Sequence, residues 1–135
     1  MSELTLVPSG TVATAKGDGP TVDVSSTSAR VFLVTLSITK IIEQESLDLS
    51  IYSSADGTTW SAKSIAAFQQ EFYEGEWPLL LDLTAHGDVK FVRAHWDVAR
   101  WGRGTETPRF EFGVTMKEVP ANILREAAAE AKALV

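Results

Sequence analysis

The sequence predicts an all-β protein, an antiparallel β-sandwich followed by a C-terminal amphipathic helix. Apolar and polar residues alternate in many short segments up to about residue 118, which is the two-residue period of half-buried strands. Turn-forming residues, glycine above all, separate these segments at short intervals, as in sandwiches and barrels. Beyond residue 118 the apolar residues recur with the period of a helix.

The N-terminal part of the chain supplies three short strand candidates, at residues 4–8, 12–15 and 21–24. Glycine, proline or serine residues bound each of them. Residues 17–20 read Gly-Asp-Gly-Pro and form the expected turn before the third candidate, because glycine accepts a positive φ where a chain reverses.

Two longer strands follow. Residues 30–42 are apolar on both sides at their start and then alternate, which is typical of a central strand whose far end is less covered. Residues 46–54 place Leu47, Leu49 and Ile51 on one side and polar side chains on the other, the pattern of a half-buried strand. Shorter candidates lie at residues 68–73 and 77–83.

The last two strand candidates, at residues 89–98 and 109–117, each have one apolar face. In the second, Phe110, Phe112 and Val114 interleave with polar residues. We therefore expect roughly eight or nine strands in all. In residues 89–98 one face carries Val92, Ala94, Trp96 and Val98, and the opposite face carries Phe91, Arg93, His95 and Asp97.

The C-terminal segment, from about residue 120 to 135, is predicted to be one helix, with Pro120 tolerated in its first turn. We consider two roles for its apolar face. It packs on its own sandwich, or it docks on another chain, because its alanines allow close helix approach but bury little area. The apolar face includes Ile123, Leu124, Ala127, Ala131 and Leu134.

The composition of the chain excludes several classes of function. The chain has 135 residues and a net charge of -6, so one domain is expected and a general nucleic-acid backbone binder is disfavoured by repulsion. It has no cysteine, which excludes disulfides and thiolate catalysis. We find neither a signal-peptide pattern nor an apolar run of about 18 residues, so we expect a protein that is not exported and not attached to a membrane.

Catalytic chemistry has little support in the sequence. Only His86 and His95 are available as histidine bases, and no nucleophile motif accompanies either. Metal-binding spacings and phosphate-binding glycine loops are also absent from the sequence. We therefore expect no enzymatic activity, no catalytic residues, no metal site and no cofactor.

A patch of basic and aromatic residues is the best candidate for a binding site. Arg93 and His95 share a strand face, and Trp101 and Arg103 follow in the adjoining loop. A flat ring with several fixed donors suits either a sugar or a protein partner. The alternative is structural, with these aromatics covering the far side of the sheet or buried under the C-terminal helix.

The hairpin at residues 47–60 ends in Ser54-Ala55-Asp56-Gly57-Thr58-Thr59-Trp60, which resembles the S-x-D-G-x-x-W hairpin of discoidin-like jelly rolls. It differs from the sialidase Asp-box by one missing residue, so a propeller is not implied. In such a hairpin the aspartate bonds turn amides and the tryptophan caps the hydrophobic end. The resemblance implies a sandwich of jelly-roll type, which we expect over residues 3–118 with a helical appendage over 119–135.

The order of segments over residues 4–118 is similar to small β-sandwich proteins among phage and prophage structural genes. That resemblance implies a part in building or decorating a particle, and with it a cytoplasmic or virion-associated location. We therefore expect a non-catalytic structural or assembly module that forms a homo-oligomer or docks on a protein partner. The alternative is a carbohydrate-binding module, with a glycan as its ligand.

Overall fold

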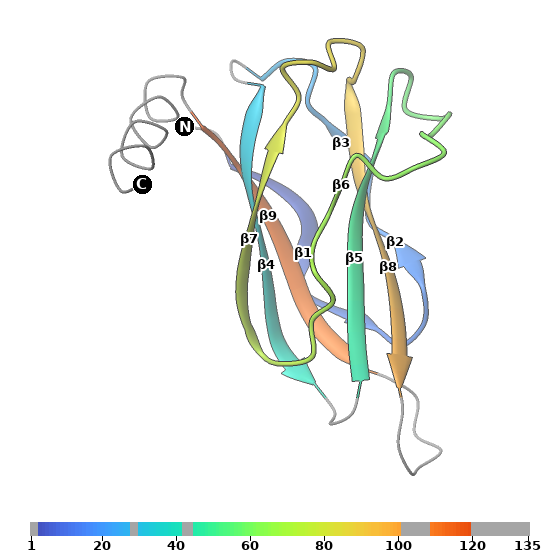
Figure 1. Ribbon diagram of the computed structural model, residues 1–135, viewed down its shortest axis with the longest axis vertical. Helices are drawn as coiled ribbons and strands as arrows, with labels where there is room; N and C mark the ends of the chain where they lie inside the picture. Colours follow the sequence, from blue (N-terminus) through green and yellow to red (C-terminus); the bar gives the residue numbers. More distant parts are fainter. Residues whose placement is uncertain (1–2, 28–29, 42–44, 101–108, 120–135) are drawn as a thin grey trace, which may run out of the picture.

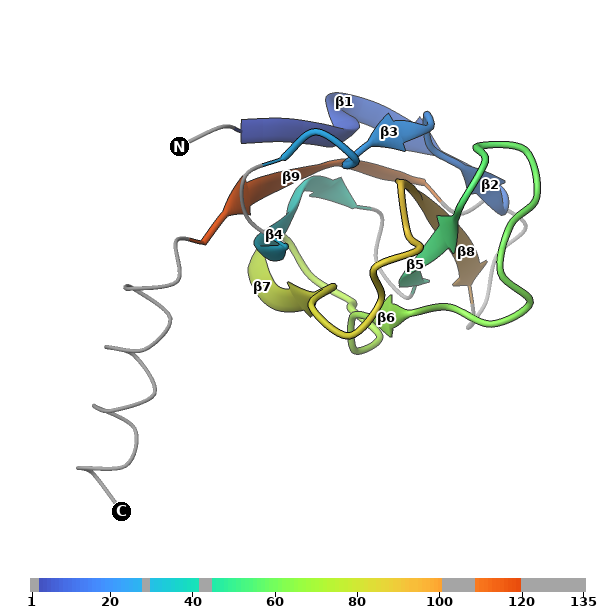
Figure 2. The same ribbon diagram turned by 90° about the horizontal axis from the view of Figure 1, so that it is seen from above.

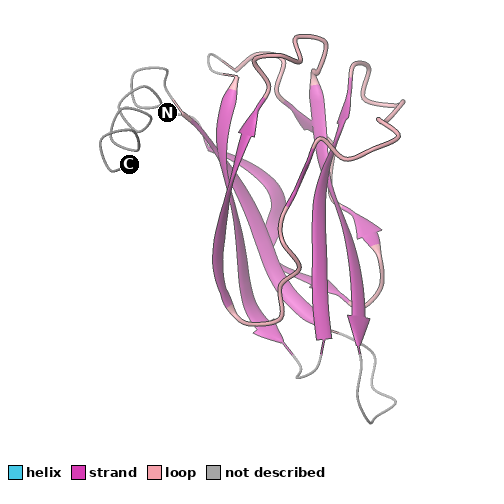
Figure 3. Ribbon diagram, in the orientation of Figure 1, coloured by secondary structure: helices cyan, strands magenta, loops and turns pink. Residues whose placement is uncertain are grey.

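The computed structural model describes residues 3–27, 30–41, 45–100 and 109–119. This part of the chain is all-β and contains nine strands and no helix (Figure 3). The strands form two antiparallel sheets that enclose one apolar core, a sandwich-like arrangement (Figures 1 and 2). The predicted C-terminal helix lies outside the described residues. In the described part, no helical segment is long and apolar enough to cross a membrane.

The two sheets differ in the number and length of their strands. The four-stranded sheet has the order β1-β9-β4-β7, and the five-stranded sheet has the order β2-β8-β5-β6 with β3 also paired to β8. The four-stranded sheet consists of β1 (Glu3–Ala13), β9 (Phe110–Glu118), β4 (Val31–Ile41) and β7 (Gly75–Asp82). The five-stranded sheet consists of β2 (Gly17–Asp18), β3 (Val22–Asp23), β8 (Phe91–Arg100), β5 (Glu45–Ser54) and β6 (Ala66–Ala67).

The core lies between the sheets because each long strand turns one set of alternate side chains inward. Trp96 of β8 meets Phe112 of β9 edge to face, with ring centroids 5.3 Å apart, and so joins the two sheets. Phe32 and Phe110 are also fully buried. The strands predicted over residues 30–42, 46–54, 89–98 and 109–117 are confirmed.

Other strand predictions are corrected. The candidates at residues 4–8 and 12–15 are not separate, because β1 runs on to Ala13 with register shifts either side of Val7, and Gly10 adopts a φ of 82°. Residues 68–73 form no strand. Only Glu71 bridges β5 there, through paired backbone hydrogen bonds with Leu47.

The tip of the 47–60 hairpin has the predicted turn chemistry. Asp56 Oδ1 accepts hydrogen bonds from the backbone nitrogens of Thr59 and Thr58, at 2.7 and 2.8 Å. These bonds, with a further one from the Ser54 hydroxyl, lower the pKa of the Asp56 carboxyl far below its ordinary value. Gly57 takes a φ of 85° beneath them, a conformation that favours glycine.

Candidate binding site

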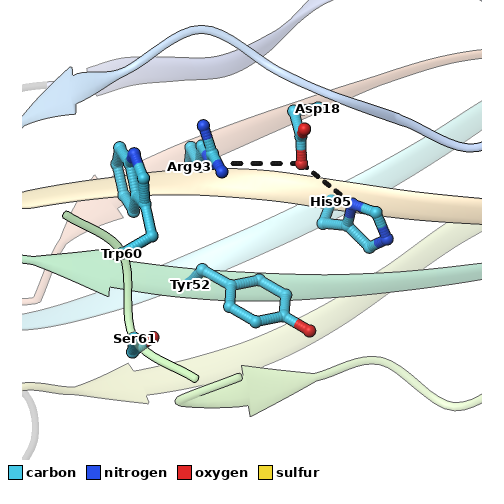
Figure 4. A pocket seen from close by; sticks show the side chains of 6 residues that line it. All are labelled: Asp18, Tyr52, Trp60, Ser61, Arg93 and His95. Atoms are coloured by element: carbon cyan, nitrogen blue, oxygen red, sulfur yellow. Dashed lines mark hydrogen bonds and ion pairs between the residues drawn. The ribbon is translucent and has the colours of Figure 1, made fainter. Parts of the chain in front are cut away.

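A shallow hollow of about 260 Å³ lies on the outer face of the five-stranded sheet. Two of its residues come from β8, one each from β5 and β2, and two from the loop after β5 (Figure 4). In Figure 4 the Tyr52 ring is seen nearly face on, below and between Trp60 and His95. The lining residues are Asp18, Tyr52, Trp60, Ser61, Arg93 and His95.

Strand alternation places the two β8 residues of the hollow. Ala94 is fully buried and Trp96 is 8% exposed, so their neighbours Arg93 and His95 point outward. On the adjacent strand Tyr52 stands opposite Arg93 in the antiparallel register. The three side chains therefore stand on two strands that pair with each other throughout this region.

Strand β2 brings Asp18 to the same face. It pairs with β8 so that Asp18 lies opposite His95 and Gly17 lies opposite Trp96. Glycine leaves room for the Trp96 indole at that point, because a Cβ there would lie only 3.1 Å from the indole ring. The Asp18 Oδ1 atom is 2.8 Å from His95 Nδ1 and 3.9 Å from Arg93 Nε.

Aromatic contacts fix the remaining orientations. The Arg93 guanidinium lies 4.3 Å from the ring centroid of Trp60, a cation–π contact. The rings of Tyr52 and His95 meet edge to face at 5.8 Å. The Ser61 hydroxyl belongs to the loop, since it donates to the Lys63 carbonyl at 2.8 Å and accepts from the Ser53 amide.

The hollow is electrically balanced and open to water. The positive charge of Arg93 faces the negative charge of Asp18, and the side chains of Arg93, His95 and Asp18 are 30, 33 and 45% exposed. The Arg93 Nε is buried and makes no hydrogen bond to the described residues. The arrangement therefore offers donors, acceptors and a flat ring to a polar ligand.

The Asp18–His95 contact also matches two of the three groups of a hydrolytic triad, in which a carboxylate orients a histidine through Nδ1. The third group would be a hydroxyl bonded to the histidine. Among the described residues, no serine, threonine or tyrosine hydroxyl bonds to the His95 ring, and the Ser50 hydroxyl reaches only the His95 backbone carbonyl. Nor do histidine, aspartate and glutamate side chains of the described part gather into a cluster able to hold a metal ion.

Sequence reasoning found part of this site. The structure brings Arg93 and His95 together as the strand pattern indicated. It also adds Asp18, which was assigned to a turn. Tyr52 belongs to the hollow too; it lies on the polar side of the strand predicted over residues 46–54, and the sequence assigned it no role. Trp60, which was expected to cap the hairpin, contributes to the hollow and contacts Arg93. Two residues of the predicted patch, Trp101 and Arg103, lie outside the described residues. So do the five residues of the predicted helix face, Ile123, Leu124, Ala127, Ala131 and Leu134.

Comparison with known proteins gives no family for this chain: no family model matches it, and no curated protein matches it.

Proposed function

We propose that this chain is a non-catalytic carbohydrate-binding module whose binding site is the hollow formed by Asp18, Tyr52, Trp60, Arg93 and His95. The observation that carries the proposal is the combination of a flat aromatic ring with fixed donors and acceptors in one hollow of about 260 Å³. That volume lies below the usual range for drug-sized ligands, which is about 300–1,000 Å³, and suits a single sugar ring.

The contacts within the hollow favour binding over bond-breaking. Asp18 and His95 are engaged with each other, and Arg93 is stacked on Trp60. Groups held in this way present a preformed surface, so little conformational entropy is lost when a ligand binds. A hydrolase of the triad type requires in addition a nucleophile bonded to the histidine.

The strand order supports a jelly-roll type of sandwich, which is the finer fold expected from the sequence. Strands β1, β9, β4 and β7 lie in one sheet, and β2, β8, β5 and β6 lie in the other. The first and last strands pair, and the chain alternates between the two sheets, which is the order expected of a jelly roll. This agrees with the resemblance of the hairpin at residues 54–60 to discoidin-like jelly rolls.

A glycan array tests the proposed function. The unmodified chain is expected to bind a defined set of saccharides, and Tyr52→Ala is expected to weaken that binding by about tenfold or more, because the ring supplies the stacking surface. Tyr73→Ala is the matched control, since Tyr73 is 71% exposed and lies outside the hollow. Circular dichroism of both variants verifies the fold. Binding to no saccharide, or equal binding by both variants, contradicts the proposal.

A structural or assembly role is the second candidate, and the outer face of the four-stranded sheet favours it. Leu33 and Leu80 are cross-strand partners there and are 39 and 51% exposed. Such an apolar pair suits contact with a second copy or another protein of a phage-like particle.

Light scattering at high protein concentration tests the assembly role. An oligomer that dissociates on the Leu33→Ser and Leu80→Ser changes supports it. A monomer, unaltered by these changes or by deletion of residues 120–135, contradicts it.

A further inference from the structure

We propose that Asp18 determines which sugars the hollow accepts, so that the site takes an uncharged saccharide and excludes anionic ones. The inference rests on the proposed function, because it assumes that the hollow binds sugars. It goes further by assigning the class of sugar and the residue that selects it.

The geometry of Asp18 gives it two tasks. Both of its contacts use Oδ1, which lies 2.8 Å from His95 Nδ1 and 3.9 Å from Arg93 Nε. The second oxygen, Oδ2, has no hydrogen-bond partner among the described residues. Since the side chain is 45% exposed, Oδ2 can accept a hydrogen bond from a ligand hydroxyl.

Without Asp18 the hollow would suit an anion. An arginine held over an aromatic ring presents fixed donors that match a carboxylate or sulfate, and Arg93 lies over the Trp60 ring in this way. Asp18 places a negative charge beside that guanidinium, so an anionic ligand would meet repulsion as well as attraction. An uncharged sugar meets only hydrogen-bonding groups.

The surrounding surface acts in the same direction. Asp48 and Asp97 are opposite each other on β5 and β8, two positions along from Ser50 and His95. Both are exposed and lie on the outer face of the sheet. Their carboxylates add negative potential beside the hollow, which further disfavours an acidic ligand.

The test compares Asp18→Asn with Asp97→Asn on an array of uncharged oligosaccharides and their sialylated and sulfated counterparts. Both changes remove one negative charge from the same face of the sheet, but only Asp18 contacts Arg93 and His95. The unmodified chain is expected to bind the uncharged members. Asp18→Asn is expected to lose about tenfold in affinity for them and to gain measurable binding to anionic ones, because it removes a charged acceptor and frees Arg93. Asp97→Asn is expected to change the preference much less, because its carboxylate contacts neither Arg93 nor His95 and adds only to the surrounding potential.

The outcomes separate this inference from the proposed function. If the unmodified chain binds sialylated or sulfated sugars as well as uncharged ones, the role of Asp18 is wrong and the carbohydrate-binding proposal stands. If Asp18→Asn and Asp97→Asn have the same specificity, the role of Asp18 is likewise wrong. If no sugar of either class binds, the proposed function itself is wrong. Circular dichroism of each variant excludes misfolding as the cause of a loss.

Discussion

The outer faces of the two sheets follow the same alternation but carry different chemistry. On the five-stranded sheet, Asp18, Trp60 and Arg93 surround a hollow. On the four-stranded sheet, Thr5, Thr115 and Thr35 form a row across three neighbouring strands, with the Leu33–Leu80 pair beside it. The difference arises because β2 and the loop after β5 add side chains to the first face. The hollow therefore forms where short segments supplement a regular strand.

Both faces depend on the layer beneath them, so a change there is expected to have the largest effect. Phe112 is fully buried and contacts Trp96 of the opposite sheet. Phe112→Ala removes this contact and leaves a cavity, and we expect a loss of about 3–5 kcal/mol in the free energy of unfolding. Urea denaturation measures it. A loss below about 1 kcal/mol would mean that the two sheets are not joined at this contact.

The next change affects the four-stranded sheet alone. A Cβ added at Gly113 would lie 2.9 Å from the Ser9 Cα and 3.2 Å from the Ser9 nitrogen, which are backbone atoms that cannot rotate away. Gly113→Ala is therefore expected to destabilise the fold by about 1–3 kcal/mol. Gly87→Ala is the control, because nothing lies within 4 Å of its Cβ position. Equal effects of the two changes in thermal denaturation would contradict the close approach of β1 to β9.

On the five-stranded sheet, a change at the hollow is expected to alter binding more than folding. Arg93→Lys keeps the positive charge but removes the planar group that lies on Trp60. We expect the free energy of unfolding to fall by no more than about 1 kcal/mol, because the contact is partly exposed. Saccharide binding is expected to weaken by about tenfold. Calorimetry measures both quantities, and unchanged binding would exclude Arg93 from the ligand site.

At the end of the sandwich, Asp56 is expected to contribute a smaller, pH-dependent stability. Its pKa is lowered from 3.8 by amide hydrogen bonds of the folded state, so the contribution is present above that value and is lost as the pH falls through the lowered pKa. Asp56→Asn should therefore reduce the melting temperature by a few degrees at pH 7 and by less near pH 2. A melting-temperature difference that stays constant over this range would contradict the assignment.

The smallest effect on stability is expected on the outer face of the four-stranded sheet. Leu80 is half exposed, so Leu80→Ser should change the free energy of unfolding by no more than about 0.5 kcal/mol. A larger loss in urea denaturation would indicate that another surface covers this residue.

The sequence predicted what depends on local alternation. The outward positions of Arg93 and His95 follow from the buried Ala94 and Trp96 between and beside them. The position of Asp18 does not, because it depends on pairing between strands 77 residues apart in the chain. Residues 68–73 were wrongly predicted as a strand, because aromatic residues favour strands wherever they occur but the pairing there is limited to one bridge.

The contrast between the two faces is tested most directly by NMR titration with the uncharged saccharide that binds best on the array. We expect the largest amide chemical-shift changes at Asp18, Tyr52, Arg93 and His95, and a change in the indole N–H signal of Trp60. Signals of Leu33 and Leu80 should stay in place. Shifts centred on those two leucines, with the hollow unaffected, would contradict it.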